Sequence, residues 1–120
     1  MKIKMALISL LMIIGASAKA EVWVCQTKEN WLIEKYDTKF LMIDTARMQG
    51  QLGNSKNWRK KYPLQTKKIA IGTKYFWKEI MPNGYPYTFS VRVKNSGSAD
   101  VTLINRKDRS WALQMECKSS

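Results

Sequence analysis

Histidine is absent from this chain of 120 residues, and cysteine occurs only twice. Without histidine, the chain lacks the Ser-His-Asp and Cys-His groups that activate nucleophiles in many hydrolases. The same absence leaves no histidine and cysteine ligand set for zinc, copper or haem iron. Calcium loops need closely spaced acidic residues, and no Asp-x-Asp run occurs. The sequence therefore predicts a protein with no cofactor and no bound metal ion.

Acidic residues are also few, nine against 21 lysines and arginines. Glycosidases use a pair of carboxylates, and the candidate pairs by spacing are Asp37 with Asp44 and Asp100 with Asp108. Asp108 lies in a run of basic residues, whose charges favour its ionised form and make it a poor proton donor. Aspartates also serve commonly in turns. We interpret these carboxylates as turn and surface groups and expect no enzymatic activity.

Long hydrophobic runs are missing after residue 20. The first 20 residues contain two early lysines, an apolar run over residues 5–15 and small residues that end in Ala18-Lys19-Ala20. This order is typical of a secretory signal peptide with an A-x-A cleavage site. The apolar run is shorter than the roughly 18 residues that a spanning helix needs. We expect residues 1–20 to be a removed signal peptide and residues 21–120 to form one periplasmic or secreted domain without a transmembrane segment.

The two cysteines, Cys25 and Cys117, lie near the ends of this expected domain. In an exported protein an even number of cysteines predicts disulfide pairing. A Cys25–Cys117 bond would close nearly the whole domain into a loop, which the chain-entropy model values at about 4 to 5 kcal/mol. No Cys-x-x-Cys spacing is present to depress a thiol pKa. We therefore predict a structural disulfide.

Apolar residues recur mostly at every second position after residue 20, as is typical of antiparallel strands. Besides a first strand around Trp23 and Cys25, the pattern predicts strands at residues 31–36, 40–45, 67–73, 75–81, 87–94, 100–105 and 111–117. Residues 46–64 are rich in glycine and polar residues and predict a long exposed loop, with room for a short helix at 57–61. About eight strands with linked ends favour a small antiparallel β-barrel, a meander in its second half. A two-sheet β-sandwich is the alternative.

One stretch, residues 45–78, contains nine basic residues and no acidic one, with tryptophans and tyrosines between them. Positive charge attracts phosphates or carboxylates, and aromatic rings stack on bases or sugars. The alternative is that the lysines only solvate a surface and the rings complete the core. If the stretch binds a polyanion or a partner, its predicted contact residues are Lys56, Trp58, Arg59, Lys60, Lys61, Tyr62, Lys67 and Lys68.

Three functions are compatible with these features. The first is a non-catalytic binding protein whose basic face engages an anionic envelope polymer or a lipid headgroup. The second is a periplasmic inhibitor or immunity protein that blocks a cell-wall-acting enzyme. The third is nucleic-acid binding, which export makes less favoured. We rank them in this order.

The second function has a structural parallel. A signal peptide, a short β-barrel and one disulfide make the overall plan similar to that of the small periplasmic inhibitors of C-type lysozymes. Those inhibitors carry a Ser-Gly-x-x-Tyr loop, whereas Ser96-Gly97 is followed here by Ser98, Ala99 and Asp100. Lysozyme is basic and would be repelled by the expected mature chain, whose net charge is +9 (18 − 9) once the three lysines of residues 1–20 are removed. An inhibitor of this charge would need an acidic target protein.

Overall fold

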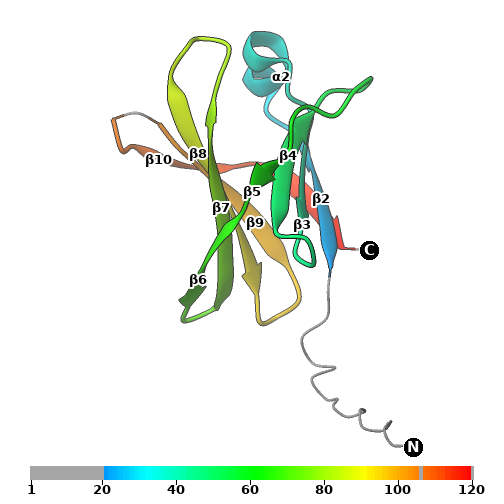
Figure 1. Ribbon diagram of the computed structural model, residues 1–120, viewed down its shortest axis with the longest axis vertical. Helices are drawn as coiled ribbons and strands as arrows, with labels where there is room; N and C mark the ends of the chain where they lie inside the picture. The colour runs from blue at the N-terminus through cyan, green and yellow to red at the C-terminus, as the bar shows by residue number, and fades with distance from the viewer. Residues whose placement is uncertain (1–20, 106, 120) are drawn as a thin grey trace, which may run out of the picture.

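The computed structural model describes residues 21–105 and 107–119, so the predicted signal peptide lies outside the described residues. Two antiparallel sheets of five strands each occupy the two sides of the molecule (Figure 1). Sheet I has the order β11-β2-β3-β4-β5, and sheet II has the order β10-β9-β8-β7-β6. The strands of sheet I are β2 (Val22–Thr27), β3 (Phe40–Asp44), β4 (Gln49–Gly53), β5 (Tyr62–Pro63) and β11 (Met115–Ser119). Those of sheet II are β6 (Gln65–Ile69), β7 (Gly72–Ile80), β8 (Pro86–Lys94), β9 (Ala99–Ile104) and β10 (Ser110–Leu113).

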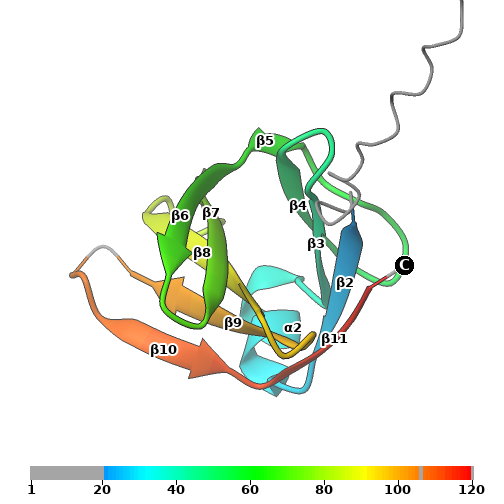
Figure 2. The ribbon, with the colours of Figure 1, turned by 90° about the horizontal axis from the view of Figure 1, so that it is seen from below.

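The closed barrel is wrong, whereas the all-β class and the antiparallel meander from β6 to β10 are confirmed. The predicted strand 111–117 divides at Gln114, so that β10 pairs with β9 and β11 pairs with β2. The carbonyl of Gln114 accepts from the Lys28 amide, and its own amide donates to the Glu29 carboxylate. Because of these bonds, Gln114 pairs neither with β9 nor with β2. In Figure 2 the chain also passes between the sheets at the β5–β6 connection, where Leu64 separates the two strands.

The core lies between the inner faces of the two sheets. Phe89 and Val91 are buried, as the alternation in residues 87–94 predicts. Trp77 of β7 stacks on Phe89 of β8 with ring centroids 5.5 Å apart. A Cβ atom at Gly50 of β4 would lie 2.6 Å from the Trp77 ring, so the absence of a side chain there allows the sheets to approach.

Residues 46–64 are only in part the exposed loop that their composition predicts, because residues 54–61 form an exposed connection whereas residues 49–53 form β4. Residues 50–53 are buried in β4, and the sequence signal was misread because Gly50 and Gly53 serve close packing rather than turns. The predicted short helix at 57–61 is also wrong, since no helix occurs there.

The predicted strand at residues 31–36 is likewise wrong, because this segment forms helix α2 (Asn30–Tyr36). Leu32 is 1% exposed, and Tyr36, four residues later, lies on the same helix face. The helix ends at Asp37, a left-handed residue whose amide donates to the Ile33 carbonyl. In Figure 1 it covers the upper end of the molecule.

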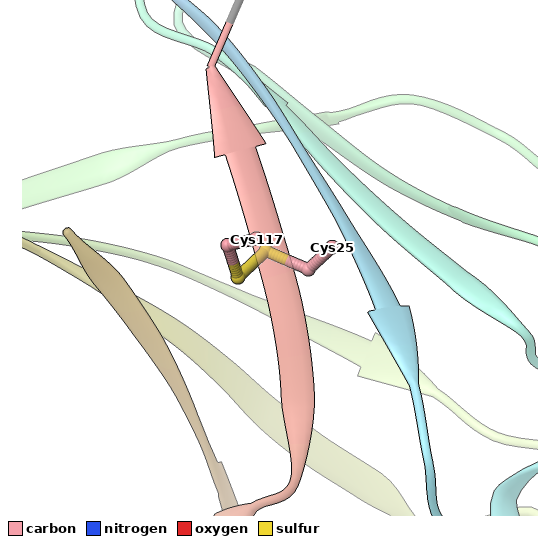
Figure 3. Close-up of a disulfide and its surroundings, with 2 residues drawn as sticks. All are labelled: Cys25 and Cys117. Carbon is pink, nitrogen blue, oxygen red and sulfur yellow. A yellow bond between two sulfur atoms is a disulfide. The ribbon is translucent and has the colours of Figure 1, made fainter.

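The predicted disulfide is confirmed (Figure 3). Cys25 of β2 and Cys117 of β11 are directly opposite in the ladder, with Cα atoms 3.9 Å apart and a sequence separation of 92 residues. The bond is compatible with an oxidising compartment outside the cytoplasm. Among the described residues no helix is long and apolar enough to cross a membrane.

Candidate functional site

The structure divides the predicted contact residues between the two sheets. Residues 56–62 lie in the connection from β4 to β5 and in β5 itself, beside sheet I. Lys67 and Lys68 lie on β6, in sheet II. In Figure 1 the β4–β5 connection extends beside α2 at the upper right, whereas β6 is at the lower left. The predicted residues therefore do not form one continuous site.

Trp58 is the exposed aromatic residue of the β4–β5 connection, with 44% of its surface accessible. Its ring packs on Phe40 with centroids 6.1 Å apart, and it lies over Gly53, where a Cβ atom would come within 2.6 Å. Together with Val24 and Lys56 these side chains border a shallow depression of about 230 Å³. Lys56 and Trp58 are thus available to a ligand on the outer side of sheet I.

Arg59 faces the protein instead. Its guanidinium donates to the carbonyls of Tyr36 and Asp37, at 3.2 and 3.0 Å, and to the hydroxyl of Thr38. It also lies 3.9 Å from the Glu79 carboxylate. These contacts join the β4–β5 connection to the carboxyl end of α2. Lys60, the next residue, is exposed and lies over the Tyr62 ring at 5.4 Å.

Glu79 is a buried carboxyl group that the sequence did not single out. Desolvation by burial raises its pKa, while the hydrogen bond from the Trp77 indole and the charge of Arg59 oppose the change. It borders a groove of about 340 Å³ with Tyr62 and Lys60. Since its oxygens face the Trp77 indole nitrogen at 3.0 Å and Arg59, its observed contacts are internal.

The other candidate carboxylates have local partners. Asp44 accepts from the amides of Ala46 and Arg47, and these bonds lower its pKa. Asp37 and Asp108 have left-handed backbone conformations at the end of α2 and in the β9–β10 turn. Within residues 21–105 and 107–119 no group of three or more histidine, cysteine and acidic side chains could hold a metal ion.

Sheet II carries a row of basic residues across its outer face. Lys67 of β6 lies opposite Lys74 of β7, and Lys74 lies opposite Arg92 of β8. Alternation along the same strands places two more basic side chains on this face. We call the five residues the basic face: Lys67, Lys74, Lys78, Arg92 and Lys94.

Asp100 is the acidic counterpart on this face. Arg92 holds its carboxylate with two hydrogen bonds of 2.8 and 2.7 Å, and the Lys94 amine lies 3.1 Å away. The hydrogen bonds from Arg92 are the main cause that lowers the pKa of Asp100. Lys67, Lys74 and Lys78 form no ion pair with any residue that the structure describes. The face therefore keeps an excess of positive charge.

Of the basic face, sequence reasoning included only Lys67 in the contact set. It left out Lys74 and Lys78, which belong to the basic stretch. It also left out Arg92 and Lys94, which lie outside that stretch and come near Lys74 only through the strand register. A signal was present, since residues 87–94 alternate and place Arg92 and Lys94 on the solvent side.

A cleft of about 400 Å³ lies at the α2 end of the molecule, and the sequence contains no signal for it. We call it the aromatic cleft. Trp31 and Tyr36 of α2 meet edge to face at 5.9 Å, and Tyr36 lies 6.0 Å from Tyr87 of β8. The hydrogen bond with Tyr87 and burial raise the pKa of Tyr36. The lining residues are Glu29, Trp31, Tyr36, Tyr87, Leu103, Trp111, Ala112 and Leu113.

Comparison of the chain with protein-family models, with curated proteins and with solved structures finds no match. The basic face, the Trp58 depression and the aromatic cleft are therefore the starting points for its function.

Proposed function

We propose that this chain is a non-catalytic binding protein whose basic face engages an anionic polymer or an anionic lipid headgroup outside the cytoplasm. The observation that carries the proposal is the row of Lys67, Lys74 and Arg92 across three adjacent strands. The predicted signal peptide and the disulfide support an extracytoplasmic place for this interaction.

The row is unfavourable for the isolated protein. Like charges directly opposite each other in a sheet are destabilising. Lys74 lies opposite Lys67, and it also lies opposite Arg92, whose charge Asp100 partly offsets. A bound chain of phosphates, sulfates or carboxylates would replace this repulsion by attraction. Strands lie about 4.8 Å apart, so the row offers closely and regularly spaced positive groups. A polyanion suits such a surface better than one isolated anion does.

Phe76 adds an apolar contact to the same surface. It lies on the outer face of β7 between Lys74 and Lys78, and the Lys74 amine lies 5.3 Å from its ring centroid. The ring can cover the non-polar part of a sugar or of a lipid headgroup region while the amines contact the anionic groups.

The test measures binding of the oxidised protein to heparin and, separately, to vesicles of phosphatidylglycerol in phosphatidylcholine. Three triple variants remove the same charge from different places. The first replaces Lys67, Lys74 and Lys78 by glutamine, the second replaces Lys56, Lys60 and Lys61, and the third replaces Lys28, Lys35 and Lys118. All nine are lysines, so the net charge of the three variants is identical.

We expect the first variant to lose the most affinity and to lower the slope of log affinity against log salt by about 2 to 3, about one per lost contact. If the second variant loses as much, the β4–β5 connection is the binding surface and the proposal is wrong. Equal losses in all three variants would show that net charge alone is responsible. The heparin and vesicle arms separate a polymer from a membrane surface. A salt-tolerant one-to-one complex with an acidic protein would instead favour an inhibitor.

A further inference from the structure

The aromatic cleft differs from the basic face in charge as well as in shape. Its lining contains four aromatic rings, and Glu29 is its one charged side chain among the described residues. No lysine or arginine of the described chain lines it, although the protein as a whole is strongly basic. The volume of about 400 Å³ is within the range of small-molecule sites.

Three of the four rings are held in place before any ligand arrives. The Trp31 indole donates to Glu29 at 3.2 Å. The Asn83 amide donates to the hydroxyls of Tyr36 and Tyr87, at 3.2 and 3.1 Å. Because these bonds already fix the side chains, a ligand would order few of them, and binding would lose little conformational entropy. Trp111, which is 43% exposed, borders the cleft from β10.

The hydrogen bonds also limit which ligand fits. One oxygen of Glu29 accepts from Trp31 and the other from the Gln114 amide, and the Asn83 amide contacts both tyrosines. A sugar would need directed donors and acceptors, which are largely used here in internal bonds. What the lining offers is four aromatic rings, whose faces carry partial negative charge, and the charge of one carboxylate. Both attract a cation, and an alkylated one also fills an aromatic site.

We propose that the aromatic cleft binds an organic ammonium group with alkyl substituents. The rings of Trp31, Tyr36 and Trp111 provide cation–π contacts, and the Glu29 carboxylate provides the opposite charge. This site is separate from the basic face, so the inference does not depend on the proposed function.

The test follows the five tryptophan indole signals in proton–nitrogen correlation spectra during titration with choline chloride. We expect saturable shifts of the Trp31 and Trp111 signals and no shift of the Trp58 signal. The neutral alcohol 3,3-dimethylbutan-1-ol has nearly the same shape as choline but no charge. It should bind at least about threefold more weakly, since the cation–π contribution is missing. Equal or tighter binding of the alcohol would overturn the proposal, as would the absence of saturable shifts.

Two tryptophans give a matched pair of variants. Trp111 and Trp58 are 43% and 44% exposed, so replacing either by alanine exposes little of the core. Trp111→Ala should weaken choline binding by about threefold or more, whereas Trp58→Ala should leave it unchanged. Equal effects of the two variants would mean nonspecific contact with exposed rings and would contradict the site.

Glu29→Gln tests the charge, because a glutamine side-chain oxygen can still accept a hydrogen bond from Trp31. We expect choline binding to weaken while binding of the neutral alcohol stays the same.

Choline affinity should change less than about threefold between about 0.05 and 0.5 M salt, since its contacts are short-ranged. Polyanion binding at the basic face should fall steeply over that range. The two proposals therefore fail or succeed independently.

Discussion

The outer faces of the two sheets differ, although both follow the same alternation of inward and outward side chains. On sheet I, Val24 pairs with Met42, which pairs with Gln51, and Trp58 covers Phe40 nearby. On sheet II, the corresponding central positions form the basic face. The centre of the solvent side of sheet I is therefore largely uncharged, whereas the centre of the solvent side of sheet II is basic.

The two sheets also differ in their stabilising links. Sheet I contains the disulfide and, through Arg59, holds the end of α2. Sheet II contains the ion pairs of Asp100 with Arg92 and Lys94, and it also contains the like charges of Lys67 and Lys74 directly opposite each other. This distribution is expected if sheet I anchors the fold and sheet II makes the contacts that we propose.

The largest expected effect comes from removing the disulfide of sheet I. Replacing Cys25 and Cys117 together by alanine releases a closed loop of 92 residues. The free energy of unfolding should fall by about 4 kcal/mol, because the unfolded chain gains conformational freedom. Urea unfolding of the variant and of the reduced natural protein measures the change. A loss below about 1 kcal/mol would contradict the anchoring role of sheet I.

The next effect concerns the contact between the sheets. Gly50→Ala would place a methyl group 2.6 Å from the ring of Trp77, which is 1% exposed and cannot move aside. We expect a loss of about 1 to 3 kcal/mol in unfolding free energy. Gly53→Ala meets Trp58 at the same distance, but that ring is exposed and can turn away. Urea unfolding should therefore show a smaller loss for Gly53→Ala, and the opposite order would contradict the packing described here.

The third effect is a pH dependence at Glu79, where the two sheets and α2 are linked. Its pKa is raised by burial above the usual value of 4.5, so the folded protein holds the proton of this carboxyl group more strongly than the unfolded chain does. The stability that this group contributes is present at low pH and is lost as the pH rises through the raised pKa. Relative to Glu79→Gln, the natural protein should therefore lose unfolding free energy as the pH rises from below 4.5 through the raised pKa.

Urea unfolding at a series of pH values measures this difference. Glu34→Gln, at an exposed position of α2, serves as the control. Parallel stability curves for the natural protein and Glu79→Gln would show that burial does not affect this carboxyl group.

The two sheets also differ in how far the sequence predicts them. Most of sheet II follows from alternation, although its first turn is at Ala70 and Ile71 rather than at Lys74 as expected. The turn lies before Gly72 because β7 begins at this glycine. The Gly72 backbone lies so close to Val93 that a Cβ atom would be 2.0 Å from the Val93 carbonyl oxygen. Such a contact depends on the partner strand and leaves no local signal.

In sheet I the sequence predicts β2, β3, the final strand and the disulfide, but not β4. Glycines such as Gly50 and Gly53 are typical of turns. Their role in close packing is evident only from the structure, in which Trp77 lies over Gly50 and Trp58 lies over Gly53. The candidate sites show the same limit. Lys67 could be named from the charge run, but its neighbour Arg92 needed the register, and the aromatic cleft needed the end of α2 to be placed beside Tyr87.

The smallest expected effect tests the basic face directly. Lys74→Gln removes the middle charge of the row and with it the repulsion from Lys67 across the sheet. The unfolding free energy should rise by about 0.2 to 1 kcal/mol, while heparin binding weakens. Lys78→Gln is the matched control on the same strand, since Lys78 lies opposite Thr88 and has no like charge across from it. It should weaken binding without stabilising the protein. Lys74→Gln could instead destabilise the fold or leave heparin binding unchanged. Either result would show that the row of like charges does not lower stability while promoting binding, and it would contradict the functional difference between the two sheets.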